Sequence, residues 1–205
     1  MNYLALGDSI SIDDYTGIAQ GGAVSQFARL LGADFQTLAR DGRTTAGVLE
    51  AWGEITLKPD IVTLTAGGND FLQGAWSVVN TQGNWDAVSA EPLANLEQIA
   101  DNLGAFTCPV IINTLYDPTD GDNSVLGAFG MAADTAEQAR TAFNALNNGI
   151  RALAARRGFL LSDLETLFHG HGALSADPWI VSHIEPGLAG ATAIANHWHT
   201  LYTVR

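Results

Sequence analysis

The fold is decided by residues 3–10, which read YLALGDSI. The first four form a continuous apolar run, which is typical of a strand buried on both faces of a parallel sheet. Gly7-Asp8-Ser9 follows this run directly. A serine at a strand-to-helix turn can present its hydroxyl, and its own backbone N–H, at the edge of the sheet. Because ligands of open α/β sheets bind beyond the carboxyl ends of the strands, we expect Ser9 to lie in a site.

Four more apolar runs follow along the chain, and segments with helical periodicity separate them. The runs are Phe35–Leu38, Ile61–Leu64, Val110–Leu115 and Phe159–Leu161. The helical segments are Ala23–Leu31, Leu93–Phe106, Thr135–Arg157 and Leu188–His199. Alternation of strands and helices predicts βαβ units with right-handed crossovers in a doubly wound α/β sheet. The 205 residues suit a single domain.

Two segments do not fit this alternation. Trp76–Ala90 is rich in Asn, Gly and Trp, and Tyr116–Ala133 is rich in turn residues. We expect both to be loops that form the walls of a cleft. Neither contains a long apolar run that would form an acyl tunnel, so we expect short acyl groups in the substrate.

Composition excludes several classes of function. The 9 basic and 22 acidic residues give a net charge of −13, which disfavours nucleic acid and anionic membranes as partners. No stretch is long and apolar enough for a membrane span. A single cysteine, Cys108, rules out an intramolecular disulfide. The chain as given shows no signal-peptide pattern, so we expect a cytoplasmic location.

Two further motifs follow the second and third apolar runs. In Asp41-Gly42-Arg43, glycine lets the backbone approach a substrate and offer an N–H, although a plain helix-entry turn has the same composition. In Gly67-Gly68-Asn69-Asp70, the Asn69 amide can face a developing negative charge, although an ordinary turn is the alternative.

The last motif is His183, with Asp177 six residues before it. A hydroxyl nucleophile needs a base within hydrogen-bond reach, and that base needs a group to orient it. Asp177 and His183 could supply both from one loop. A histidine near proline in a surface loop is the alternative.

Taken in order, the Gly-Asp-Ser, Gly, Gly-Gly-Asn-Asp and late His motifs resemble the SGNH (GDSL-like) hydrolase superfamily. The resemblance runs from Gly7 to the last predicted helix. It implies a three-layer α/β/α, flavodoxin-like fold with a five-stranded parallel sheet. It also implies Ser9 as nucleophile, His183 as base, and an oxyanion hole from the Ser9 N–H, the Gly42 N–H and the Asn69 side chain.

One departure from the family pattern concerns the acid. The family has Asp-x-x-His, which would put the acid at position 180, where this chain has Ile180. We expect Asp177 to orient His183, with a carboxylate oxygen about 3 Å from the ring. Glu185 and a main-chain carbonyl are the alternatives.

The resulting hypothesis is a serine esterase that acts on a small-molecule or carbohydrate ester and needs no cofactor. No metal site is expected, because the pairs His169/His171 and His197/His199 lack a third ligand and are read as surface histidines. The competing hypothesis is an inactive binding module of the same fold, which the missing acid at position 180 favours.

Overall fold

The computed structural model describes residues 1–81, 83–122 and 132–204. A five-stranded, all-parallel sheet forms its centre, as the family resemblance implies, and its strand order is β2-β1-β3-β4-β5. The strands are β1 (Asn2–Gly7), β2 (Asp34–Thr37), β3 (Ile61–Thr65), β4 (Val110–Asn113) and β5 (Leu160–Ser162). Because β1 and β3 are adjacent and parallel, the loops that follow them meet at the same edge of the sheet.

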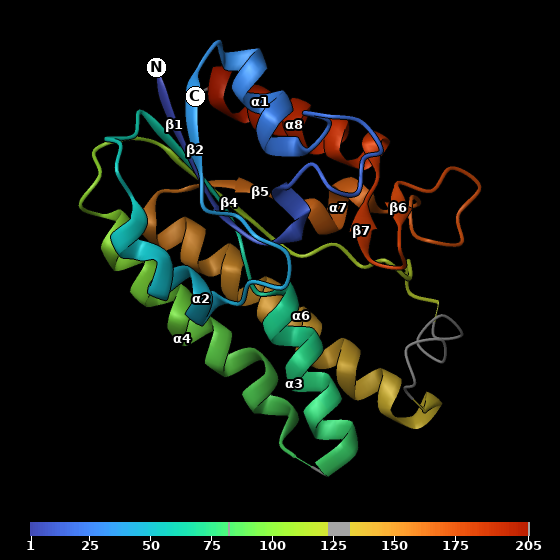
Figure 1. The fold of residues 1–205 in the computed structure, drawn as a ribbon. Coiled ribbons are helices and arrows are strands. Elements are labelled where there is room, and N and C mark those ends of the chain that lie inside the picture. Colours follow the sequence, from blue (N-terminus) through green and yellow to red (C-terminus); the bar gives the residue numbers. More distant parts are fainter. Residues whose placement is uncertain (82, 123–131, 205) are drawn as a thin grey trace.

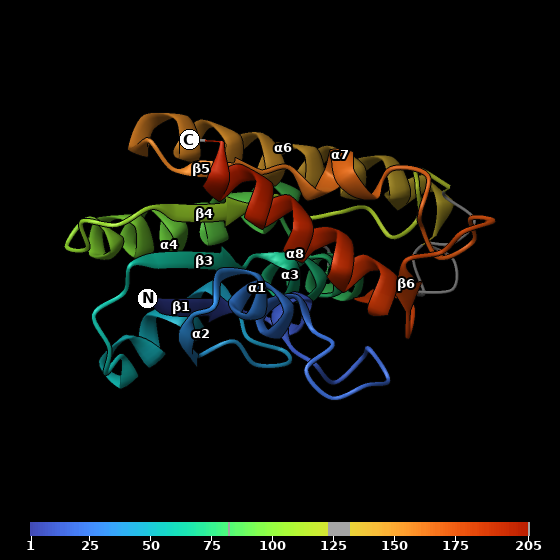
Figure 2. The same cartoon turned by 90° about the horizontal axis from the view of Figure 1, so that it is seen from above.

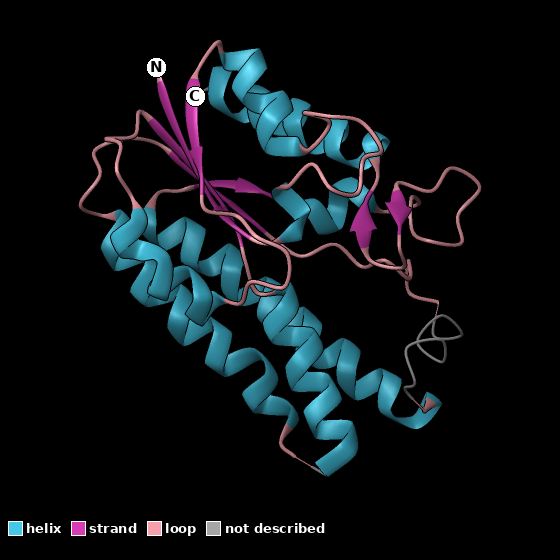
Figure 3. Ribbon diagram, in the orientation of Figure 1, coloured by secondary structure: helices cyan, strands magenta, loops and turns pink. Residues whose placement is uncertain are grey.

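Side chains of the central strands alternate between two cores, because successive side chains of a strand point to opposite faces. Tyr3 and Ala5 pack on the face covered by α1 (Ala23–Leu31) and α8 (Leu188–Thr203). Leu4 and Leu6 pack on the other face. That face is covered by α2 (Thr45–Glu50), α4 (Trp85–Leu103) and α6 (Ala133–Arg157). The result is the three-layer α/β/α arrangement of Figures 1 and 3.

Two helices flank the edge at which the strands end. They are α3 (Gly68–Thr81) and α7 (Leu164–Phe168). Figure 2 shows α8 running across the sheet with α1 beside it. Among the described helices, none combines the length and apolar character needed to cross a membrane.

The prediction of a loop over Trp76–Ala90 is wrong, because α3 and α4 together take up most of it. Asn84 is the N-cap of α4, and its side-chain oxygen accepts a hydrogen bond of 2.9 Å from the Asp86 N–H. Pro92 lies inside α4, eight residues into the helix, so the predicted start at Leu93 is also wrong. The Gly and Asn of this segment form the short connection between two helices rather than a long loop.

The second predicted loop, Tyr116–Ala133, is irregular over residues 116–122. Residues 123–131 lie outside the described part of the chain. A two-stranded antiparallel hairpin that the sequence does not predict, β6 (Ile180–Val181) with β7 (Glu185–Pro186), lies before α8. This hairpin carries His183 in its turn.

Candidate active site

The end of β1 places Ser9 at the sheet edge. Gly7 has φ +138°, and a Cβ there would lie 2.0 Å from the Thr65 carbonyl oxygen of β3, so only glycine fits. The Asp8 carboxylate accepts a hydrogen bond of 3.2 Å from the Ile10 N–H and caps a short 3-10 helix, Ser9–Ser11. Ser9 is thereby fixed in a buried turn, with 7% of its surface exposed.

The Asn69 and Gly42 motifs are joined by hydrogen bonds. The Asn69 amide donates to the Arg43 carbonyl at 3.1 Å. The neighbouring Asp70 carboxylate accepts from the Thr45 N–H at 2.9 Å and from the Thr45 hydroxyl at 2.6 Å. A side-chain amide has two N–H donors, so the bond to Arg43 leaves one for a ligand.

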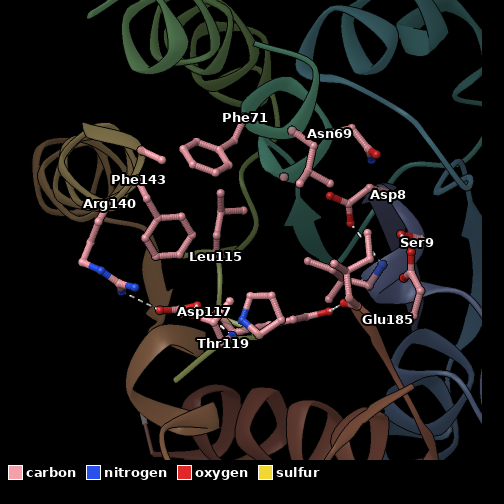
Figure 4. Close-up of a pocket in the computed structure, with 17 residues that line it drawn as sticks. Asp8, Ser9, Asn69, Phe71, Leu115, Asp117, Thr119, Arg140, Phe143 and Glu185 are labelled. Carbon is pink, nitrogen blue, oxygen red and sulfur yellow. Dashed lines mark hydrogen bonds and ion pairs between the residues drawn. The ribbon is translucent and has the colours of Figure 1, made fainter. Parts of the chain in front are cut away.

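Gly42 lies in the loop that these bonds hold, with φ +70°. That left-handed conformation favours glycine and explains its place beside Arg43. Asn69 and Ser9 line the same pocket (Figure 4). Gly42 lines a separate shallow depression with Asp41 and Arg43.

Glu185 lies directly on Ser9. The Ser9 hydroxyl donates a hydrogen bond of 3.1 Å to Glu185 Oε1, and the glutamate is 6% exposed. Glu185 enters the sequence interpretation only as an alternative orienter of His183. Ser9 and Glu185 are 176 residues apart, and no periodicity or motif spacing connects them.

His183 lies in the exposed turn of the β6–β7 hairpin. Ser182 and His183 both have positive φ, +48° and +73°, which is strained for non-glycine residues. The Tyr116 hydroxyl donates to the Ile184 carbonyl of the same turn. Residues with strained backbone conformations of this kind cluster at functional sites.

The Asp177 carboxylate contacts His171, with 3.5 Å between Oδ2 and Nδ1, and its side chain is 78% exposed. His171 also pairs through the same nitrogen with the Asp177 carbonyl at 2.9 Å, and it stacks on Trp179. The sequence interpretation did not connect Asp177 with His171. The pairing of Asp177 with His183 stays a prediction.

The pocket beside Ser9 has an apolar wall and a charged end. Leu115, Phe71 and Phe143 form the wall, and the two phenylalanine rings meet edge to face at 5.5 Å between centroids. Figure 4 shows Ser9 and Glu185 on one side and the ion pair of Arg140 with Asp117 on the other. Among described residues, Trp76 and Trp85 are not part of the lining, so the predicted Trp-bearing wall is wrong.

Buried carboxyl groups dominate the electrostatics near Ser9. Desolvation raises the pKa of Asp8 to about 7, although hydrogen bonds from Thr65 and Ile10 act in the opposite direction. Burial also raises the pKa of Glu185, while the bond from Ser9 lowers it and the charge of Asp41 raises it further. Both groups therefore hold protons more readily than exposed carboxylates.

The described residues include no group of three or more His, Cys, Asp or Glu side chains that is arranged to hold a metal ion. Burial lowers the pKa of His197, which favours its neutral form. The groups that the structure brings together at this sheet edge are a serine hydroxyl, a carboxylate and an amide donor.

Comparison with known proteins shows the family of the chain. Residues 5–193 match the model of the GDSL-like lipase/acylhydrolase family. No curated protein matches the sequence.

Solved structures give the same fold at low sequence identity. An extracellular lipase from Streptomyces rimosus is 22% identical with a TM-score of 0.71, over 99% of this chain and 98% of that one. A lipase from a goat rumen metagenome is 20% identical with a TM-score of 0.76, over 98% and 97%. A variant of an acetyl xylan esterase from Geobacillus stearothermophilus is 17% identical with a TM-score of 0.69, over 98% and 93%. The chain belongs to the GDSL-like lipase/acylhydrolase family and is a carboxylic ester hydrolase of the SGNH/GDSL type.

Proposed function

We propose that this ester hydrolase is a serine esterase that works through an acyl-enzyme, with Ser9 as its nucleophile. The observation that carries the proposal is the position of Ser9 beyond the carboxyl end of β1, in one pocket with Asn69. Ser9 attacks the ester carbonyl, the alcohol leaves, and water hydrolyses the acyl-enzyme. The mechanism needs no cofactor.

The oxyanion that forms in each step is held by the Ser9 N–H, the Gly42 N–H and the Asn69 amide. The bond from Asn69 to the Arg43 carbonyl supports this role, because it keeps the amide beside the loop that carries Gly42. Donors that are fixed before the reaction stabilise the transition state without reorganisation, at about 3 kcal/mol each.

His183 is the base of Ser9 in this proposal. Asp177 is the carboxylate that orients it, and Glu185 and a main-chain carbonyl are the alternative orienters. The hairpin turn supports a functional role for His183, because its positive φ values are costly and are held by Tyr116.

The proposed substrate is a small-molecule or carbohydrate ester with a short acyl group. One structural neighbour is an acetyl xylan esterase, which makes acetylated carbohydrates a class to test. The ion pair of Arg140 with Asp117 at the far end of the pocket supports a short acyl group. A long alkyl chain would displace water from these charges, at a cost in free energy.

The decisive test is Ser9→Ala. We expect it to abolish hydrolysis of p-nitrophenyl acetate and labelling by a fluorophosphonate probe. The melting temperature should change little, because one buried hydroxyl is removed without a change of backbone. Ser77→Ala, at an exposed serine of α3, is the matched control and should keep full activity.

Wild-type turnover in the Ser9→Ala variant would show that another group is the nucleophile. A folded wild-type protein that neither hydrolyses esters nor takes up the probe would instead be the inactive binding module.

A further inference from the structure

The Ser9 hydroxyl already has a proton acceptor, and that acceptor is a carboxylate. Ser9 Oγ donates to Glu185 Oε1 at 3.1 Å, and both residues are buried. The geometry is that of a nucleophile with a base, which needs heavy atoms about 2.6–3.2 Å apart. Figure 4 shows the two side chains facing each other at one side of the pocket.

The backbone around Glu185 fixes this contact. Glu185 pairs with Val181 in the β6–β7 hairpin, and the preceding residue, Ile184, accepts the hydrogen bond from the Tyr116 hydroxyl. The Gly187 N–H donates to the Trp179 carbonyl at 2.8 Å on the other side. Glu185 is therefore held on both sides, and its carboxylate is aimed at Ser9 by the fold.

Within the described ranges, none of the ion pairs formed by Arg side chains includes Glu185. The charge of Asp41, on a neighbouring loop, raises the pKa of Glu185. The charge of Glu185 in turn raises the pKa values of Asp8, Tyr15 and Tyr116. His183 lies two residues away in the hairpin turn. A buried carboxylate among acids has a strong tendency to accept a proton, and the nearest one belongs to Ser9.

We propose that Glu185 is a catalytic base that acts on Ser9 directly and shares the transfer of its proton with His183. The proposal rests on Ser9 being the nucleophile. It gives Glu185 a task of its own, different from orienting the histidine.

The proton and electron pairs balance in this scheme. As the bond from Ser9 Oγ to the acyl carbon forms, the Ser9 O–H bond breaks and its proton moves to Glu185. Glu185 then protonates the alcohol oxygen as the bond between the acyl carbon and that oxygen breaks. In the second half a water molecule loses a proton to Glu185 and attacks the acyl-enzyme. Glu185 returns the proton to Ser9 Oγ as the acyl group leaves.

Only the ionised form of Glu185 can accept a proton, and this sets how activity depends on pH. Burial raises the pKa of Glu185, so the group is an effective base only above that raised value, and activity through it is lost as the pH falls. A His183→Ala variant lacks the other proton acceptor. The residual activity of a His183→Ala variant should then follow the ionisation of the buried carboxyl groups.

The test compares Glu185→Gln, Glu185→Asp and His183→Ala on p-nitrophenyl acetate and on an alkyl acetate. We expect Glu185→Gln to lower kcat about 10²-fold with little change in KM, as for loss of a general base. The loss should be larger for the alkyl ester, because an alkoxide needs a proton to leave and p-nitrophenolate does not. Glu185→Asp should recover part of the activity, because it restores a carboxylate.

Glu91→Gln makes the same chemical change at an exposed position of α4 and is the control that should keep full activity. Wild-type kcat and an unchanged pH profile in Glu185→Gln would overturn the proposal. If Glu185→Gln does not fold, the His183→Ala variant decides. Residual labelling by the fluorophosphonate probe that rises with pH supports Glu185 as a base of Ser9. Labelling as low as in Ser9→Ala overturns that role. Either outcome leaves Ser9 as nucleophile, which the Ser9→Ala variant tests separately.

Discussion

At the scale of single residues, Asn69 shows how a side chain is prepared for a charge that exists only briefly. Its amide is held by the Arg43 carbonyl at 3.1 Å, and the adjacent Asp70 ties the same loop through Thr45. Such a group should bind the transition state more strongly than the substrate.

We therefore expect Asn69→Ala to lower kcat about 10²–10³-fold, equivalent to about 3–4 kcal/mol, with little change in KM. Steady-state kinetics on p-nitrophenyl acetate measures both constants. Asn80→Ala, at an exposed asparagine of the same helix α3, controls for the loss of an amide and should be neutral. A rise in KM at constant kcat would make Asn69 a residue that binds the ground state.

Individual site residues differed in how far the sequence could predict them. Ser9 and Asn69 follow apolar runs directly, so strand topology alone brings them to one edge and into one pocket. Glu185 begins a two-residue strand, and its contact with Ser9 depends on a hairpin turn that has no sequence signature. Asp177 shows the same limit, because its contact with His171 depends on how an irregular loop folds back.

At the scale of elements, α4 and α6 pack unusually closely. A Cβ at Gly149 of α6 would lie 2.4 Å from a terminal methyl carbon of Leu93 on α4. This pair forms part of the layer under β3 and β4. The missing side chain at Gly149 gives Leu93 its space, and backbone freedom is not the reason for the glycine, since it lies in the middle of a regular helix.

We expect Gly149→Val to destabilise the fold by about 1–3 kcal/mol through overpacking. Urea denaturation measures the change. Ala145→Val places the same side chain on an exposed position of α6 and should cost only its helix propensity, a few tenths of a kcal/mol. In a Leu93→Ala background the cost of Gly149→Val should shrink, because the obstructing methyl groups are gone. An unchanged cost there would place the strain elsewhere.

Elements were predictable where hydrophobic periodicity was strong. The five apolar runs correspond to the five parallel strands. β1, β3 and β4 are buried between the two helical layers, whereas β2 is a largely exposed edge strand that pairs with β1. Trp76–Ala90 has the composition of a loop, because Gly83 and Asn84 lie between α3 and α4, yet most of the segment is helical. The packing of α4 against α3 and α6 outweighs the turn-forming composition of this segment.

At the scale of the whole molecule, the sheet edge, α3, α6 and the 115–119 segment enclose one pocket with Ser9 at one side. The enclosing elements come from distant parts of the chain, so the size of the pocket could not be read from any one segment. The net charge of −13 disfavours anionic esters as substrates, because like charges repel.

The pocket predicts how acyl-chain length is selected. Phe71 on α3 and Phe143 on α6 meet edge to face in its wall, and the Arg140–Asp117 pair lies beyond them. We expect the wild type to hydrolyse acetyl and butyryl esters faster than long-chain esters, because a longer chain meets these rings and then the ion pair. Phe71→Ala removes one of the two rings that lie between Ser9 and the ion pair. The preferred acyl chain should therefore become longer by several carbons.

A series of p-nitrophenyl esters of increasing length measures kcat/KM for both proteins. Phe35→Ala removes a partly exposed ring from the edge strand β2, away from the pocket, and should keep the wild-type preference. Faster wild-type hydrolysis of long-chain than of acetyl or butyryl esters would show that the chain leaves the pocket by another route. An unchanged preference in Phe71→Ala would mean that the acyl group does not lie against α3. In that case the alcohol part of the ester would be the group that lies against the apolar wall of the pocket.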